Sequence, residues 1–158
     1  MKKIFIPLLF ASIVLACGTT KNSTTTQSNL PKGTWVLNSI TYDDSDEYSI
    51  KLFNDASNTC FTGSIWKFSS NKQKGTYSIT DATCQPGDRY FVFKIDETKQ
   101  EIGKYDFLIT PTDADGNSET NAAFRTKMIS LTSSKMEWQQ TSTIDGSPFV
   151  FTMNFIKQ

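Results

Sequence analysis

The feature that most constrains the fold is a succession of short segments in which large apolar side chains recur at every second position. The clearest is 148–156, where the apolar positions are Phe149, Phe151, Met153 and Phe155. A period of two is that of a β-strand, because successive side chains of an extended chain point to opposite faces. No convincing stretch shows the 3.6-residue period of an amphipathic helix. The pattern therefore predicts an all-β domain.

The predicted strands follow one another at short intervals, separated by turn residues and without a long crossover. They span 34–41, 64–69, 76–80, 89–95, 104–110, 122–132, 135–141 and 148–156, and segment 48–53 is compatible with either a short strand or a helical turn. A meander of about eight strands loses its exposed edges most simply by closing on itself. We therefore predict an antiparallel up-and-down β-barrel, with a two-sheet sandwich as the alternative.

The N-terminal residues differ from the rest of the chain. Lys2 and Lys3 precede an apolar stretch, 4–16, that is too short to span a bilayer as a lasting helix and ends in Ala16. We predict a signal peptide over 1–16. Val14-Leu15-Ala16-Cys17 resembles the lipobox of bacterial lipoproteins, which implies acyl chains such as palmitate on Cys17 and anchorage to a membrane. The alternative is an ordinary signal with an incidental cysteine.

Segment 18–29 contains no aliphatic or aromatic side chain. A run of this composition cannot bury enough apolar surface to offset its ordering entropy, so we predict that 17–29 is a lipidated cysteine with a flexible tether. The folded domain is expected at 30–158. The tether lacks the acidic cluster that resembles surface-export signals in some lipoproteins. We therefore expect an exported protein, lipid-anchored to the outer membrane and facing the periplasm.

Two compositional features limit the function. The chain has no histidine, which removes imidazole bases, histidine-activated nucleophiles and most transition-metal sites. We therefore expect a protein without catalytic activity, bound metal or cofactor. We interpret the acidic runs at 43–47 and 113–119 as solvated turns. The basic and acidic residues number 16 each, and loss of Lys2 and Lys3 leaves 14 against 16. That balance gives no strong overall field for nucleic acid or an anionic membrane surface.

Two cysteines remain once Cys17 is assigned to the anchor. In an exported protein, Cys60 and Cys84 are most simply interpreted as a disulfide. Closing a loop of about 25 residues stabilises a fold by roughly 3.5 kcal/mol in a chain-entropy estimate. The alternative is that both cysteines are reduced, buried thiols. A zinc site is not expected, because two isolated cysteines lack the paired spacing of its ligands.

Several motifs resemble one family. Gly33-Thr34-Trp35 resembles the GxW signature of lipocalins, in which the Trp packs under one end of the barrel and closes it. Trp66-Lys67-Phe68, 75–79 and the two cysteines add to this, and the whole is similar to the lipocalin-like domain of small Gram-negative lipoproteins. The likeness extends over 30–158. The chain lacks the second Thr-Asp-Tyr motif and a late Arg that would cover Trp35.

The resemblance implies a binding protein. A barrel of eight strands either is filled by side chains or holds one small ligand. The candidate aromatic lining, which suits an apolar ligand, is Trp66, Phe68, Tyr77, Phe93, Phe107, Phe124 and Phe151. Arg89 and Arg125 are the only guanidinium groups available to a ligand carboxylate. We predict non-catalytic binding or carriage of a small hydrophobic ligand. The alternative is a protein-interaction or envelope-assembly module with a filled barrel and an unknown partner.

Overall fold

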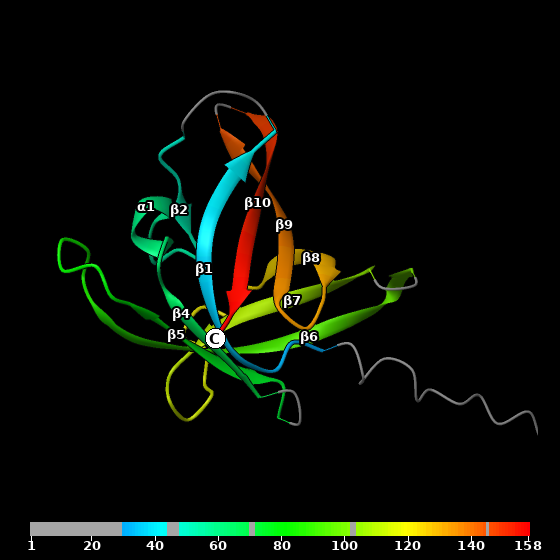
Figure 1. Ribbon diagram of the computed structural model, residues 1–158, viewed down its shortest axis with the longest axis horizontal. Coiled ribbons are helices and arrows are strands. Elements are labelled where there is room, and N and C mark those ends of the chain that lie inside the picture. Colours follow the sequence, from blue (N-terminus) through cyan, green and yellow to red (C-terminus); the bar gives the residue numbers. More distant parts are fainter. Residues whose placement is uncertain (1–29, 44–47, 70–71, 102–103, 145) are drawn as a thin grey trace, which may run out of the picture.

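The chain forms a closed antiparallel barrel of eight strands (Figure 1). The computed structural model describes residues 30–43, 48–69, 72–101, 104–144 and 146–158, so the predicted signal peptide, Cys17 and tether lie outside the described residues. The predicted barrel is confirmed. Its strands, in chain order, are β1 (Gly33–Tyr42), β4 (Ile65–Ser69), β5 (Lys74–Ile79), β6 (Gly87–Glu101), β7 (Lys104–Thr112), β8 (Phe124–Leu131), β9 (Lys135–Ile144) and β10 (Ser147–Lys157).

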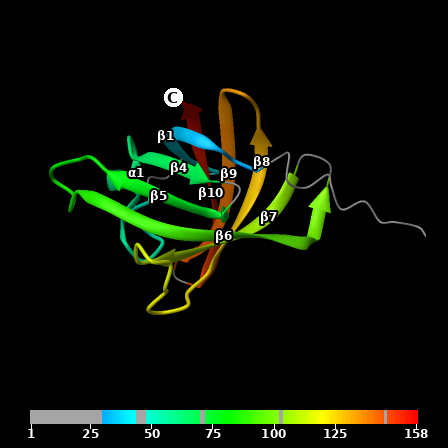
Figure 2. The same cartoon turned by 90° about the horizontal axis from the view of Figure 1, so that it is seen from below.

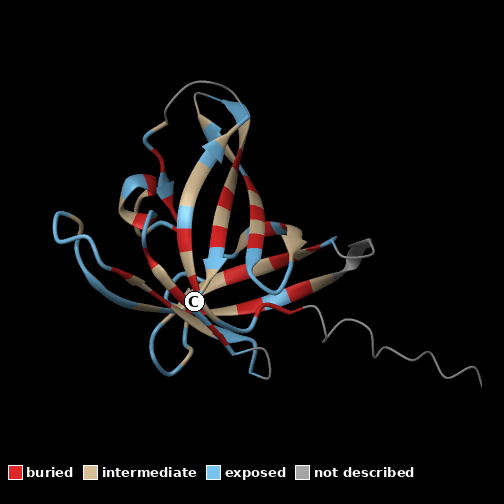
Figure 3. Ribbon diagram, in the orientation of Figure 1, coloured by how far each residue is buried: buried red, intermediate tan, exposed pale blue. Residues whose placement is uncertain are grey.

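Each barrel strand pairs with the next barrel strand along the chain, and β1 closes the sheet by pairing with both β4 and β10. Trp35 is the junction, since it lies opposite Trp66 on β4 and Lys157 on β10. Strands on opposite walls cross at a steep angle, as the two perpendicular views show (Figures 1 and 2). Buried and exposed positions alternate along the strands (Figure 3). The period of two in the sequence therefore separates the interior of the barrel from its outer wall.

The connection between β1 and β4 carries small elements that the sequence did not resolve. These are β2 (Lys51–Leu52), β3 (Ala56–Ser57) and the single-turn helix α1 (Asn58–Phe61). We call Lys51–Phe61 the capping segment, because its Leu52, Phe53 and Phe61 are buried in the core cluster at one end of the barrel. The ambiguous segment 48–53 thus contains a short strand. Within the described part of the chain, no helix has the length and apolar character needed to cross a membrane.

The two ends of the barrel are distinct. The mouth is the end that carries the capping segment, the β5–β6 loop (80–86) and the β7–β8 loop (113–123). The base is the opposite end, where β1 begins, β10 ends and the β8–β9 turn lies. The backbone N–H of Lys157 donates to Ser134 O at 3.0 Å, and that of Gln158 donates to Thr34 O at 3.0 Å. These bonds join β1, β10 and the β8–β9 turn at the base.

Aromatic side chains fill the interior. The ring centroid of Trp66 lies 4.7 Å from that of Tyr77 and 5.3 Å from that of Trp138, which is itself 4.5 Å from Phe155. Gly75 makes room for this packing, because a Cβ there would lie only 2.3 Å from Phe91 Cζ. Trp138 Nε1 is buried and has no hydrogen-bond partner among the described residues. The interior is therefore a packed, largely apolar core.

Candidate ligand-binding site at the barrel mouth

A cleft of about 380 Å³ opens at the mouth, between the capping segment, the start of β6 and the β7–β8 loop. Its walls combine aromatic and charged side chains. Phe53, Tyr77 and Phe124 supply rings, and Asp55 and Arg89 supply opposite charges. A concave surface with an apolar body and a few polar groups is the usual form of a small-molecule site.

Phe53 reaches the cleft through a tight turn between β2 and β3. The backbone N–H of Asp55 donates to Leu52 O at 2.9 Å, and Phe53 and Asn54 have φ angles of 52° and 58°. Left-handed φ at both central residues is the geometry of a type I′ turn. For Phe this conformation is strained, at a cost of order 1–3 kcal/mol.

The strained turn is compensated by aromatic packing. The ring of Phe53 lies 5.5 Å from that of Phe124, 5.8 Å from that of Trp66 and 6.2 Å from that of Tyr77, between centroids. Such pairs each contribute about 0.5–1.5 kcal/mol beyond their area burial. The turn thus places an aromatic ring between the cleft and the packed interior.

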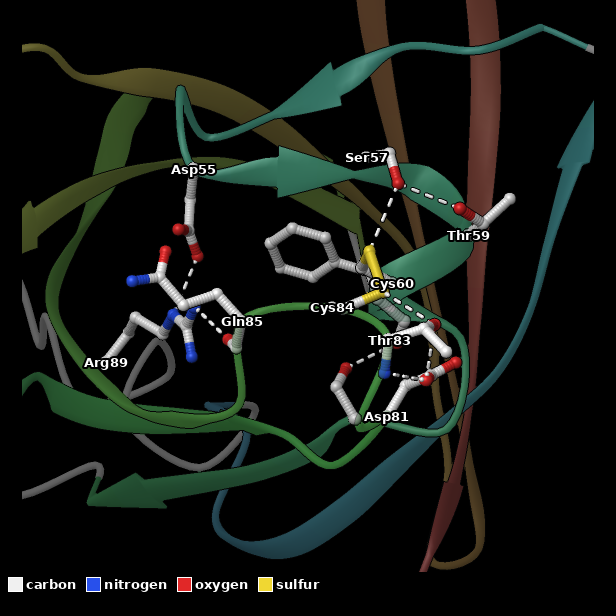
Figure 4. Close-up of a disulfide and its surroundings, with 11 residues drawn as sticks. Asp55, Ser57, Thr59, Cys60, Asp81, Thr83, Cys84, Gln85 and Arg89 are labelled. Atoms are coloured by element: carbon white, nitrogen blue, oxygen red, sulfur yellow. Dashed lines mark hydrogen bonds and ion pairs between the residues drawn. A yellow bond between two sulfur atoms is a disulfide. The ribbon is translucent and has the colours of Figure 1, made fainter.

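One carboxylate links the capping segment to the barrel wall. Asp55 Oδ2 accepts from Arg89 Nε at 2.9 Å and from the Tyr77 hydroxyl at 2.9 Å. Of the remaining guanidinium nitrogens of Arg89, Nη2 donates to the carbonyl of Gln85 at 2.7 Å (Figure 4). Nη1 donates to the carbonyl of Gly87, also at 2.7 Å. Arg89 is therefore engaged in holding the mouth together, and a ligand carboxylate would have to displace these partners.

The Tyr77 hydroxyl stays protonated well above neutral pH. Burial is the largest cause that raises the pKa of Tyr77, and the charge of Asp55 and its hydrogen bond add to it, while Arg89 opposes it. The group therefore acts in the cleft as a neutral hydrogen-bond donor.

A disulfide joins the capping segment to the β5–β6 loop (Figure 4). It links Cys60 on α1 to Cys84, as the cysteine count predicted. The loop is ordered by Asp81, whose carboxylate accepts from the backbone N–H and the hydroxyl of Thr83 at 2.8 and 2.7 Å. These hydrogen bonds lower the pKa of Asp81. The mouth is thus tied by one covalent bond and one ion pair.

The predicted lining residues divide between two places. Tyr77 and Phe124 line the mouth cleft. The others are buried in the packed core, namely Trp66, Phe68, Phe93, Phe107 and Phe151. Arg125 lies on the outer wall, where Nη1 contacts Asp96 at 2.6 Å and Asp106 at 3.2 Å. Phe53 and Asp55 were not among the predicted lining residues. The local signal of their turn is the adjacent Asn54, a residue type that tolerates left-handed φ.

The acidic run at 113–119 forms a turn. The Asp113 carboxylate accepts from the backbone N–H groups of Gly116 and Asn117, both at 2.8 Å, and these bonds contribute to a lowered pKa. No group of acidic or cysteine side chains among the described residues is arranged to hold a metal ion.

At the base, Trp35 is buried and its Nε1 donates to Lys32 O at 3.1 Å. The amine of Lys157 lies 5.2 Å from the centroid of the Trp35 ring, within the range of a cation–π contact. A Cβ on Gly33 would lie 3.5 Å from Lys157 Cε, so the lysine stem also covers Gly33. Lys157 thus supplies the cation that covers Trp35, a position for which the lipocalin pattern has an Arg late in the sequence.

A closed eight-stranded meander barrel with a buried GxW tryptophan at its base defines a lipocalin-like architecture. The family model described as "Lipocalin-like domain" matches residues 32–138, and the chain belongs to this family. Searches of curated proteins and of solved structures gave no match. A lipocalin-like barrel fits the binding or carriage of a ligand in general, and members of the family are typically non-catalytic binding proteins.

Proposed function

We propose that this protein is an exported lipoprotein that binds a small hydrophobic molecule at the mouth of its barrel. The cleft of about 380 Å³ beside Phe53, Tyr77 and Phe124 is the observation that carries the proposal. Its volume lies within the range of small-molecule sites, roughly 300–1,000 Å³. Because the interior is occupied by packed rings, we place the ligand at the mouth, over the aromatic core.

The charges around the cleft restrict the polar end of the ligand. Arg89 is already paired with Asp55, whereas Asp88, Asp113 and Glu119 also line the cleft. Within the described lining the carboxylates outnumber the cation, so an anionic ligand is disfavoured. We therefore propose a ligand with an apolar body and a neutral or positively charged polar end.

The anchor is the second part of the proposal. The motif that ends at Cys17 supports acylation, and Leu30, the first described residue, is buried. It precedes β1, which begins at the base, so the tether would join the barrel at the end opposite the cleft. Mass analysis of the N-terminal peptide from an envelope fraction should show Cys17 as the first residue with three acyl chains. An unmodified Cys17 contradicts the anchor.

A matched pair of substitutions tests the cleft. Ala122 lines the cleft and Ala123, beside it, does not. Ala122→Trp should fill the cleft and reduce binding of a neutral hydrophobic probe, N-phenyl-1-naphthylamine, at least about tenfold, as expected when an indole occupies a ligand's position. Ala123→Trp should bind the probe like the wild type.

Native mass spectrometry of protein purified gently from the envelope, before and after organic extraction, should reveal the natural ligand. Equal probe binding in the two alanine variants contradicts the mouth site, even if a ligand is extracted.

The packed interior favours a second candidate, a protein-interaction module without a ligand. Its contact surface would be the groove of about 270 Å³ on the outer wall between β4–β6 and the β7–β8 loop, where Tyr90 is exposed. Absence of any extractable ligand and of probe binding, together with cross-links from Tyr90 to one defined envelope protein, would favour this candidate over the first.

A further inference from the structure

The base of the barrel carries a group of lysines. Lys32 directly precedes β1, Lys72 lies in the turn between β4 and β5, and Lys135 begins β9. All three are exposed, and Lys157 adds a partly buried amine over Trp35. None of these lysines forms an ion pair with another described residue. Glu137 shares the outer face of β9 with Lys135, but it is half-buried and likewise has no ion-pair partner in the described part.

Acidic side chains gather at the opposite end. Asp81 lies in the β5–β6 loop, Asp88 lies at the start of β6, and Asp113, Asp115 and Glu119 lie in the β7–β8 loop. All five are exposed. The chain as a whole has equal numbers of basic and acidic residues, so its net charge conceals this separation. Asp115 lies on the stretch of the β7–β8 loop that folds back along the outer wall, where Lys74 Nζ donates to Asp115 O at 3.4 Å. The acidic residues of the mouth itself are therefore Asp81, Asp88, Asp113 and Glu119, at the end of the described barrel opposite the lysines of the base.

An exposed aliphatic side chain lies among the basic residues. Ile156 on β10 is 46 % exposed and is paired with Lys135 on β9 and Val36 on β1. Only Ile156 and Tyr90 are large hydrophobic residues that remain exposed in the described chain. An exposed apolar side chain beside lysines is the composition of a surface that rests at the headgroup level of a membrane.

Leu30 is buried immediately before β1, so the 29 residues that precede it in the sequence are attached to the barrel at the base. We infer that the base of the barrel is a docking surface for an anionic phospholipid membrane, with the mouth facing away from that membrane. Lysines near an anionic surface are attracted within about one Debye length, roughly 10 Å at 0.1 M salt. The acidic mouth is repelled by the same surface, so both ends favour one orientation.

The docking surface is tested without the anchor. Residues 17–158 carrying Cys17→Ser contain the whole closed barrel, its core and its disulfide, and no acyl chain. This form should partition onto vesicles of phosphatidylglycerol and phosphatidylcholine at low salt and be released as salt is raised. It should not partition onto vesicles of phosphatidylcholine alone. The triple variant Lys32→Gln, Lys72→Gln and Lys135→Gln should bind at least about tenfold more weakly.

The matched control removes three exposed lysines from elsewhere, through Lys51→Gln, Lys94→Gln and Lys127→Gln. It changes the net charge equally and should reduce binding by less than about twofold, because these lysines lie away from the base. Equal weakening of both triple variants would show a response to net charge and overturn the docking surface. So would the absence of partition onto anionic vesicles at low salt.

Orientation gives a second readout. A solvatochromic dye on Ser133→Cys in the β8–β9 turn should shift on vesicle binding, and the same dye on Thr143→Cys near the mouth should not. A shift at Thr143 instead would overturn the inference. Because acyl chains and cleft ligand are absent from these measurements, their outcome is independent of the proposed function.

Discussion

The mouth and the base close the same barrel in different ways. The base is closed by the strands themselves, since β1 joins β10 and β4 around Trp35 and Lys157 covers that ring. The mouth is covered by an added segment that carries a strained turn at Phe53 and is held by one disulfide and one ion pair. Regular sheet pairing provides stability, whereas the added segment leaves room for a cleft. Binding is therefore expected where pairing is least regular, because local opening is easiest there.

The largest expected effect compares one aromatic residue at each end. Trp35→Ala removes a buried indole, its hydrogen bond and its cation–π contact at the base. We expect the free energy of unfolding to fall by about 4 kcal/mol. Phe124→Ala, at a half-buried ring of the mouth, should cost roughly 1.5 kcal/mol. Urea unfolding of both variants measures the difference, and equal losses would remove the distinction between the ends.

Loss of the disulfide should lower the stability almost as much, and its local effect should be greatest at the mouth. Replacing Cys60 and Cys84 by Ala opens a loop with a sequence separation of 24 residues and should lower stability by roughly 3.5 kcal/mol. Amide hydrogen exchange should then show the largest loss of protection in the capping segment, which can also open locally, and a smaller loss in β1 and β10 that reflects the lower global stability. Uniform loss of protection across the barrel would mean that the disulfide supports the whole fold.

Alkaline pH should act on both ends through two tyrosines. Burial raises the pKa of Tyr77 near the mouth and of Tyr105 near the base. Stability from these neutral hydroxyls is complete below the pKa of about 10 of an exposed tyrosine and is lost as pH rises above it. At pH 11 each should cost roughly 1.4 kcal/mol relative to pH 8. Tyr105→Phe should reduce the slope of stability against pH in urea unfolding. An unchanged slope would contradict this assignment.

The sequence predicted the features that follow from the alternation of apolar side chains. It did not predict the features that depend on contacts between residues far apart in the chain. The barrel strands followed from a period of two, and their boundaries agreed within a few residues except for β6, predicted as 89–95 and observed as Gly87–Glu101. The cysteine count predicted the disulfide. The interior rings were chosen as candidate ligand lining, with a filled core as the alternative, and all of them except the half-buried Phe124 are buried. Burial was the expected part of that choice, because any large ring on the inward face of a strand must pack somewhere.

What the sequence could not show is whether those rings leave a void. Trp66 and Phe107 were equally good candidates for a lining or a core, and only their packing against Trp138 decides that they are core. Asp55 and Arg89 are 34 residues apart, and nothing local pairs them. The charge separation between base and mouth could not be predicted for the same reason, since the net charge does not say where in the fold the charged residues lie.

The smallest effect sharpens the role of Asp55, the carboxylate that joins the two sides of the mouth. Asp55→Asn removes the charge that pairs with Arg89, and both side chains are partly exposed. We expect a loss of about 1 kcal/mol. The pKa of Tyr77 should fall, because Asp55 is one of the causes that raise it, while Tyr105 near the base keeps its pKa. Asp88→Asn is the matched control, since Asp88 also lines the cleft but accepts a hydrogen bond from the half-buried Ser78 hydroxyl. Spectrophotometric titration of the tyrosines should therefore separate the two variants, and identical titrations would show that Asp55 holds the mouth no more than its neighbour does.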